Sequence, residues 1–257
     1  MAVITLTTDW GLRDHHVAAL KGKILRTISK PQLIDVSHDI QPYNIAQAAY
    51  LFRNTYNEFP EGSVHFIGVG AFPPSNAGLI AIKKQGHAFI GMNDGFFSLV
   101  FDDQPVDIVQ LNESGIPYAA YDIPAIVHAM HHLATGKNIY ELGSRLQDFV
   151  QKNDFRPVIE EDVIRGSVIY IDDFGNAVTN IDTKLFEQLR QGRRFEINAR
   201  RQQYTISTLS TKYADADRGN LLALFNASGY LEIAINQGNA AMLLGLKNND
   251  TIRIDFA

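Results

Sequence analysis

Short apolar runs alternate with stretches of helical periodicity through the first three-fifths of the chain. Apolar runs of this length predict buried strands, and apolar residues spaced three and four apart predict helices. The predicted strands cover 3–7, 32–36, 64–69, 79–83, 88–92 and 107–111, and the predicted helices cover 17–28, 44–54 and 126–134. Strands that alternate with helices usually form a sheet covered on both faces. We therefore predict an α/β domain over residues 1–155, with a mostly parallel sheet and Rossmann-like layers.

The pattern changes after about residue 150. Residues 151–166 are polar and contain a Glu-Glu-Asp run, which predicts a linker. Beyond it, short predicted strands cover 167–172, 194–197, 203–206, 221–225, 230–235 and 250–255, and one helix covers 183–189. Short strands separated by turns are typical of small all-β domains. Residues 163–257 are therefore predicted to form a small all-β barrel domain.

Composition narrows the class of protein. The chain has 257 residues, of which 46% are hydrophobic and 20% charged, as expected for a folded protein with two domains. Its formal charge of -5 disfavours nucleic acid and anionic membranes as partners. The lack of cysteine excludes disulfides, thiolate metal sites and a cysteine nucleophile. With no apolar run long enough to span a bilayer and no leader pattern, we expect a cytoplasmic protein.

The first candidate site follows the strand predicted at 3–7. Thr8, Asp9 and Gly11 come at its carboxyl end, and Asp14 precedes the first helix. Small ligands bind at the carboxyl ends of strands in open α/β sheets. A carboxylate there is suited to a ribose diol, because each oxygen accepts one hydrogen bond. The alternative is that Asp9 and Asp14 only cap the next helix.

The second candidate site opens the β domain. An apolar strand leads into Asp172, Phe174, Gly175 and Asn176. An aromatic ring can stack on a flat heterocycle, and a carboxamide can pair with a donor and an acceptor on its edge, so this group suits adenine. The alternative is a turn in which Asp173 and Asn176 bind their own backbone.

Further motifs occur at 34–40 (Ile-Asp-Val-Ser-His-Asp-Ile), 59–65 (Phe-Pro-Glu-Gly-Ser-Val-His), 93–95 (Asn-Asp-Gly) and 228–236 (Ser-Gly-Tyr-Leu-Glu-Ile-Ala-Ile-Asn). In this order and at these spacings, and together with the two clusters above, they make the chain resemble the S-adenosylmethionine (SAM) hydrolase family. Its members are also called SAM hydroxide adenosyltransferases and are related to the SAM-dependent fluorinase and chlorinase. The resemblance runs nearly from end to end.

The resemblance implies an α/β domain, a β-barrel and a homotrimer in which SAM or an adenosine-type ligand lies between two subunits. It implies no cofactor, since SAM itself is the substrate or ligand. Asp9 would hold the ribose diol, Tyr43 would pack near the sugar, and Asp172 would face the methionine ammonium. The other implied ligand-binding residues are Asp14, Phe174, Asn176 and Asn236, and Ser228, which stands where the halogenases carry an arginine.

In this family an oxygen nucleophile attacks the 5′ carbon of SAM, and an Asp, an Arg and a His activate the water. Here Gly70, Ala77 and Ala119 occupy those three positions, so the water-activating set is replaced. His16 and Tyr118 are the candidate substitutes. The expected activity is hydrolysis of SAM to adenosine and methionine. A non-catalytic SAM or nucleoside sensor is the alternative, and transfer to a halide is a third possibility without positive support in the sequence.

Two other features receive a structural interpretation. His128, His131 and His132 share one helical face, but no glutamate completes a His-Glu-x-x-His pattern, so we predict no metal site. The arginine pairs at 193–194 and 200–201 are interpreted as a solvated strand edge rather than a nucleic-acid surface.

Overall fold

The computed structural model describes residues 2–70, 78–101, 103, 107–111, 123–152, 156–199 and 204–257. The chain divides into two compact units, Met1–Lys152 and Asn153–Ala257.

The first unit contains a mixed sheet with the strand order β2-β1-β3-β5-β4-β6-β7. Its strands are β1 (Val3–Thr8), β2 (Gln32–Ser37), β3 (Val64–Gly68), β4 (Leu79–Lys84), β5 (His87–Met92), β6 (Asp107–Leu111) and β7 (Gly143–Arg145). The strands β2, β1, β3 and β5 are mutually parallel, whereas the pairs β5–β4, β4–β6 and β6–β7 are antiparallel. The predicted parallel sheet is thus confirmed only for this half.

The reversal begins at the hairpin between β4 and β5. Gln85 and Gly86 alone join the two strands, and both have positive φ, 51° and 78°. A two-residue loop of this kind connects antiparallel strands, because a parallel crossover needs a dozen or more residues. The prediction of a mostly parallel sheet overlooked this turn.

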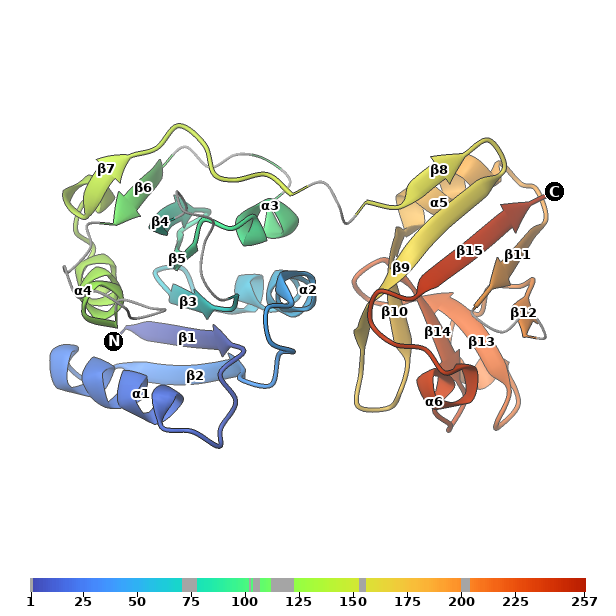
Figure 1. The fold of residues 1–257 in the computed structure, drawn as a ribbon, viewed down its shortest axis with the longest axis horizontal. Helices are drawn as coiled ribbons and strands as arrows, with labels where there is room; N and C mark the ends of the chain where they lie inside the picture. The colour runs from blue at the N-terminus through green and yellow to red at the C-terminus, as the bar shows by residue number, and fades with distance from the viewer. Residues whose placement is uncertain are drawn as a thin grey trace. The chain divides into compact units, whose positions relative to one another are not determined.

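Helices cover both faces of the sheet (Figure 1). They are α1 (His16–Thr27), α2 (Ile45–Arg53), α3 (Phe96–Val100) and α4 (Ile123–Ala134), with single turns at Tyr56–Glu58 and Ile139–Glu141. On one face, Leu20 of α1 and Met130 of α4 pack with Ile4 and Phe66. On the other, Phe52 of α2 contacts Phe89 and Phe96 edge-on or tilted, at centroid separations below 6 Å. These layers bury the strands and leave their ends exposed to the loops.

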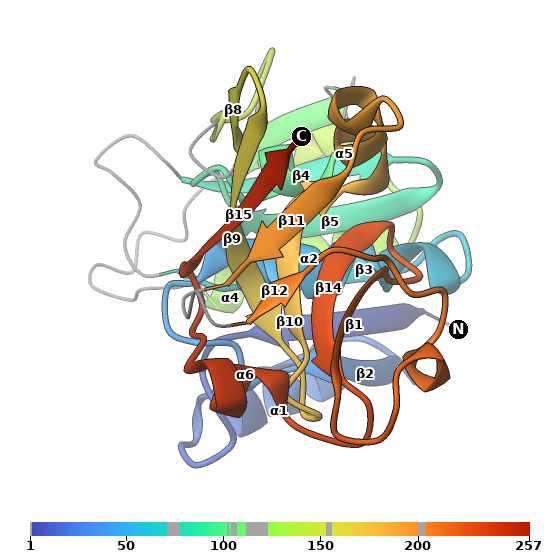
Figure 2. The ribbon, with the colours of Figure 1, turned by 90° about the vertical axis from the view of Figure 1, so that its right-hand side faces the viewer.

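The second unit is a nearly closed antiparallel barrel with the strand order β12-β11-β15-β9-β10-β14-β13 (Figure 2). Its elements are β8 (Val158–Glu160), β9 (Val163–Ile171), β10 (Ala177–Asp182), α5 (Thr183–Arg190), β11 (Phe195–Asn198), β12 (Thr205–Ile206), a turn at Tyr213–Asp215, β13 (Leu221–Phe225), β14 (Tyr230–Ile235), α6 (Ala240–Leu244) and β15 (Thr251–Phe256). Ser210 N–H donates to Ala223 O at 2.8 Å, which links the segment after β12 to β13 and nearly closes the barrel.

The predicted linker at 151–166 is too long. Strand β8 pairs with β9 from Val158↔Arg165 to Glu160↔Val163, so the acidic pair Glu161 and Asp162 forms the turn of a hairpin. All three side chains of β8 are exposed. A strand of three residues is too short to show the alternation of apolar and polar residues that identifies strands, and the polar residues on either side of it led to the linker interpretation.

Candidate functional site

The carboxyl ends of the four parallel strands meet at one edge of the first sheet. Asp9 follows β1, Tyr43 lies between β2 and α2, Gly70 follows β3 and Asp94 follows β5. We call these four residues the strand-end site. Parallel strands place their carboxyl ends together, and this edge is where open α/β sheets bind ligands.

Asp9 connects three loops of this site. Its Oδ2 accepts hydrogen bonds from Tyr43 N–H at 2.9 Å and from Gly70 N–H at 3.2 Å. Both donors have positive φ, 68° for Tyr43 and 90° for Gly70, which turns the two backbones toward the carboxylate. A carboxylate can accept further bonds through its other lone pairs. Asp9 therefore has both a fixed position and remaining capacity for a ligand.

The helix-capping alternative for Asp9 and Asp14 is wrong. Helix α1 starts at His16, its N-cap is His15, and within the described ranges no side chain caps it. Asp14 is exposed in the preceding loop, and Asp9 is directed to Tyr43 and Gly70 instead.

A chain of polar contacts supports the base of the site. Thr8 Oγ1 lies 2.7 Å from His38 Nδ1, and His38 Nε2 lies 3.1 Å from Asp35 Oδ1. Lys21 of α1 donates to the other oxygen of Asp35. Desolvation raises the pKa of Asp35, but the contacts with Lys21 and His38 outweigh it and hold that pKa below its usual value. This chain explains why the motif at 34–40 accompanies Asp9, a connection that the sequence did not reveal.

Asp94 is a site residue to which sequence reasoning gave no role. Its Oδ1 accepts a hydrogen bond from Phe96 N–H at 3.0 Å, at the start of α3. Its Oδ2 lies 2.9 Å from the point where a β-carbon on Gly70 would stand. The rule that selected Asp9, a carboxylate at the carboxyl end of a buried strand, would also have found Asp94, which is the second residue after β5.

In the second unit, Asp172 organises the predicted adenine-binding loop. Its Oδ1 accepts from Phe174 N–H (3.0 Å) and Asn176 N–H (2.8 Å), and its Oδ2 accepts from the Asn176 side chain (2.9 Å). The loop is thus a side-chain-bonded turn, as the alternative interpretation proposed, but Asp172 rather than Asp173 holds it. The turn leaves the Phe174 ring 77% exposed and buries Asn176.

Gly175 is required in this loop by space. A β-carbon there would stand 2.1 Å from the side chain of Asn239, which caps α6 through Met242 N–H. Nearby, Asn236 follows β14 and donates its side-chain amide to Ala216 O at 2.8 Å. Because Ala177 pairs with Ile233, Asn176 and Asn236 lie at the same end of the β10–β14 pair.

Ser228 lies at the other end of β14, in the turn that Asn226 and Gly229 form before the strand. Six extended residues span about 17 Å. A ligand that contacts both Ser228 and Asn236 of one copy must therefore extend along the whole strand.

The proposed catalytic substitutes are only partly placed. His16 is exposed, and its ring lies 4.3 Å from that of His15 and 6.4 Å from that of Trp10. Ala77, Ala119 and Tyr118 lie outside the described residues. His132 is buried, and its Nε2 lies 2.8 Å from Asn138 O. In the part of the chain that the structure describes, no three histidine or acidic side chains are placed to share a metal ion.

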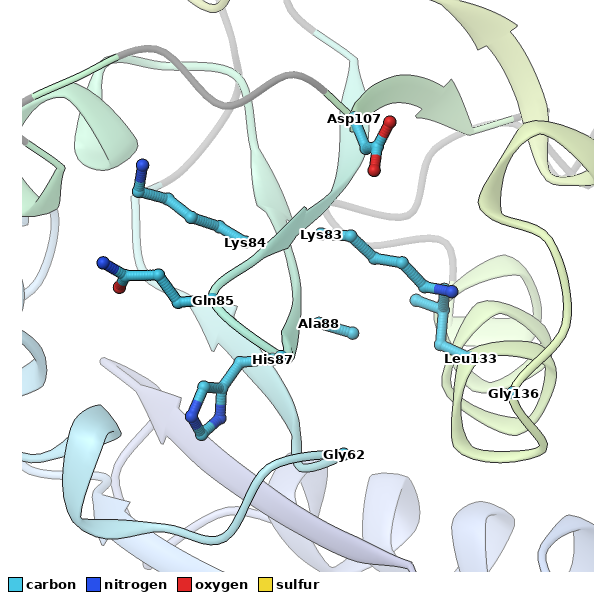
Figure 3. Close-up of a pocket in the computed structure, with 10 residues that line it drawn as sticks. Gly62, Lys83, Lys84, Gln85, His87, Ala88, Asp107, Leu133 and Gly136 are labelled. Carbon is cyan, nitrogen blue, oxygen red and sulfur yellow. The ribbon is translucent and has the colours of Figure 1, made fainter.

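A pocket of about 370 Å³ lies at the opposite edge of the first sheet (Figure 3). Lys83 and Lys84, which are among its lining residues, point to opposite sides of β4 (Figure 3). Lys83 Nζ donates to Lys137 O at 3.1 Å, and Lys84 pairs with Asp103 at 2.8 Å. Asp107 accepts from Tyr140 O–H at 2.6 Å. Because its charged groups diverge and already have partners, this pocket is a weaker ligand site than the strand-end site.

Among the described residues, no helix combines the length and the apolar character needed to cross a bilayer.

The structure thus combines an α/β unit that has a carboxylate at the ends of its parallel strands with an antiparallel barrel that carries an exposed aromatic loop. In open α/β sheets, such strand ends are where ligands bind. Comparison with protein-family models identifies the family of the chain. Residues 4–143 match the family model of the SAM hydroxide adenosyltransferase N-terminal domain, and residues 166–253 match that of its C-terminal domain. The chain belongs to the SAM hydroxide adenosyltransferase family, which confirms the resemblance found in the sequence.

Relatives match over nearly the full length. A protein of Methanocaldococcus jannaschii named (R)-S-adenosyl-L-methionine hydrolase is 29% identical, with 99% of this chain and 96% of that protein covered. A fluorinase of Nocardia brasiliensis is 25% identical, with 98% and 96% covered. The crystal structure of an uncharacterized conserved protein from Thermotoga maritima has a TM-score of 0.84 at 25% identity, with 98% and 99% covered.

Proposed function

We propose that this protein hydrolyses SAM to adenosine and methionine. One observation carries the proposal: loop amides fix the carboxylate of Asp9 at the strand end, where the family resemblance implies an aspartate that accepts hydrogen bonds from the ribose diol. The names of the relatives, (R)-S-adenosyl-L-methionine hydrolases among them, support the same substrate.

In the proposed complex, Asp9 binds the two ribose hydroxyls and Tyr43 packs near the sugar. Phe174 stacks on adenine, since its ring is exposed on a loop that Asp172 holds rigid. Asn176 and Asn236 complete the adenine end, and the turn at Ser228, at the other end of β14, binds the amino-acid end of a SAM molecule that extends along the strand. Following the family resemblance, we further propose that a homotrimer completes the site with residues of two subunits.

The chemistry requires a positioned nucleophile. The sulfonium of SAM is a good leaving group, because methionine departs as a neutral thioether. Water is a weak nucleophile, so the site must orient it in line with the 5′ carbon and remove a proton. No cofactor enters this scheme.

Incubation of the protein with SAM in H₂¹⁸O tests the proposal. Chromatography with mass spectrometry should show adenosine and methionine in equal amounts, with ¹⁸O at the 5′ oxygen of adenosine. SAM binding without products would replace the hydrolase with the sensor alternative. A halogenated nucleoside formed only when halide is added would replace it with halide transfer.

A further inference from the structure

In the strand-end site, the carboxylate of Asp94 occupies the space beside Gly70 that a side chain at position 70 would need. Gly70 has φ of 90° and carries no side chain. The space that its side chain would enter is taken by Asp94, whose Oδ2 lies 2.9 Å from the missing β-carbon. Any side chain at position 70 would have to displace this carboxylate, so the two positions share one location in the site.

Asp94 also lies close to Asp9. Gly70 N–H donates to Asp9 Oδ2 at 3.2 Å, so the two carboxylates are on neighbouring sides of one residue. Standard bond lengths place them no more than about 9 Å apart. Their roles differ, because Asp9 Oδ2 already accepts two loop amides whereas Asp94 turns Oδ2 toward Gly70.

We propose that Asp94 is the proton acceptor for the attacking water in SAM hydrolysis. This inference rests on the proposed function. In the step, the water oxygen forms a bond to the 5′ carbon of SAM and the carbon–sulfur bond breaks. The electron pair of that bond stays on sulfur, which leaves as the thioether of methionine. One water proton passes to the Asp94 carboxylate, and the other remains on the new 5′ hydroxyl of adenosine.

The surroundings of Asp94 suit this role. Burial raises the pKa of Asp94 above its usual value, although the hydrogen bond from Phe96 N–H and the charge of Lys152 act in the opposite direction. A carboxylate with a raised pKa is a stronger base at neutral pH. The charged groups near Asp94 are Lys152, which limits the rise in its pKa, and Asp9, which lies on the other side of Gly70.

A purely structural role for Asp94 is a clear alternative, because its Oδ1 binds Phe96 N–H at the start of α3. Asp94→Asn separates the two roles. The asparagine keeps an Oδ1 that accepts this hydrogen bond, but it cannot take up a proton from water. Asp107→Asn is the matched control, since Asp107 lies at the opposite edge of the sheet and pairs with Tyr140.

The experiment measures SAM affinity by calorimetry and kcat by adenosine release for the wild type, Asp94→Asn, Asp94→Ala and Asp107→Asn. We expect Asp94→Asn to lose about 100-fold or more in kcat, with SAM affinity close to that of the wild type. Asp107→Asn should retain the wild-type kcat. An Asp94→Asn enzyme with wild-type kcat, when Asp94→Ala is impaired, would assign Asp94 to the structure alone and overturn the inference while leaving the hydrolase intact. A wild type that binds SAM but releases no adenosine would overturn the proposed function, and the role of Asp94 with it.

Discussion

The two edges of the N-terminal sheet carry similar residue types but differ in how these are arranged. At the edge where the parallel strands begin, which we call the amino edge, lysines, a histidine and an aspartate line a pocket of about 370 Å³. Lys83, Lys84 and Asp107 in this pocket each have a partner. At the carboxyl edge, Asp9 and Asp94 lie on neighbouring sides of Gly70.

This difference shows that a pocket does not by itself indicate a ligand-binding site. Side chains at adjacent strand positions point to opposite faces, so Lys83 and Lys84 cannot converge on one ligand. The parallel strand ends bring residues 9, 43, 70 and 94 together although they are distant in sequence. Convergence of acceptors, rather than volume, supports our proposal that the ligand binds at the carboxyl edge.

Removal of the Asp9 side chain should have the largest effect. Two hydrogen bonds from ribose hydroxyls to a charged acceptor contribute about 3 kcal/mol or more, which corresponds to about 100-fold or more in affinity. We expect Asp9→Ala to weaken SAM and adenosine binding by this factor in a calorimetric titration. Asp107→Ala, the same change at the amino edge, should bind normally; equal losses in both variants would remove the distinction between the edges.

The amino edge should matter for stability in acid. The Nδ1 atom of His65 lies 2.8 Å from Thr5 Oγ1, and its Nε2 atom lies 3.1 Å from His87 Nδ1. Burial, and then the nearby charge of His87, lower the pKa of His65 to about 3. The unfolded chain therefore binds this proton more readily between pH 6.5 and about 3, so stability falls as the pH decreases through that window, by up to about 1.4 kcal/mol per unit.

Urea unfolding between pH 7 and 4 measures this dependence. His65→Phe should flatten the slope, because the group that takes up the proton on unfolding is gone, even though Thr5 loses a partner. The exposed His128 provides the control, and His128→Gln should keep the wild-type slope. Identical slopes in all three proteins would show that His65 does not determine acid stability.

Phe174 extends the comparison to the second unit. Its ring is 77% exposed, so Phe174→Ala should leave the thermal midpoint almost unchanged. Stacking of a base on an aromatic ring contributes about 1–3 kcal/mol, and we expect SAM affinity to fall by about tenfold or more. Unchanged affinity in a folded variant would remove Phe174 from the adenine site.

The smallest effect is expected at Lys83. Its ammonium binds a backbone carbonyl at the amino edge. Exposed polar contacts contribute little, so Lys83→Ala should alter SAM affinity by less than about twofold. A larger loss would indicate that an anionic part of the ligand reaches the pocket.

Much of the fold could be predicted because its main strands are buried. Strands β1, β3 and β14 lie within a residue of their expected bounds, since their apolar runs reflect burial. The five-residue helices α3 and α6 escaped detection because they are too short to show helical periodicity. The reversal at Gln85 and Gly86 depends on one turn that an analysis of periodicity does not weigh.

The site was only partly predictable for a related reason. Asp9, Phe174 and Asn176 could be predicted because each lies in a short motif at the end of an apolar strand, where its residue type indicates a ligand contact. The relation between Gly70 and Asp94 is one of space across two strands, and spacing along the chain does not reveal it. The sequence likewise could not show that Asp172, rather than Asp173, accepts the hydrogen bonds of its turn, because this depends on the direction of the side chain.

Hydrogen exchange with and without SAM distinguishes the two edges most directly. If SAM binds at the strand-end site, peptides that contain the amides of Tyr43 and Gly70 should exchange more slowly with SAM, while peptides over residues 83–88 should be unaffected. SAM-dependent protection confined to residues 83–88 would place the ligand in the opposite pocket and contradict the assignment of the carboxyl edge.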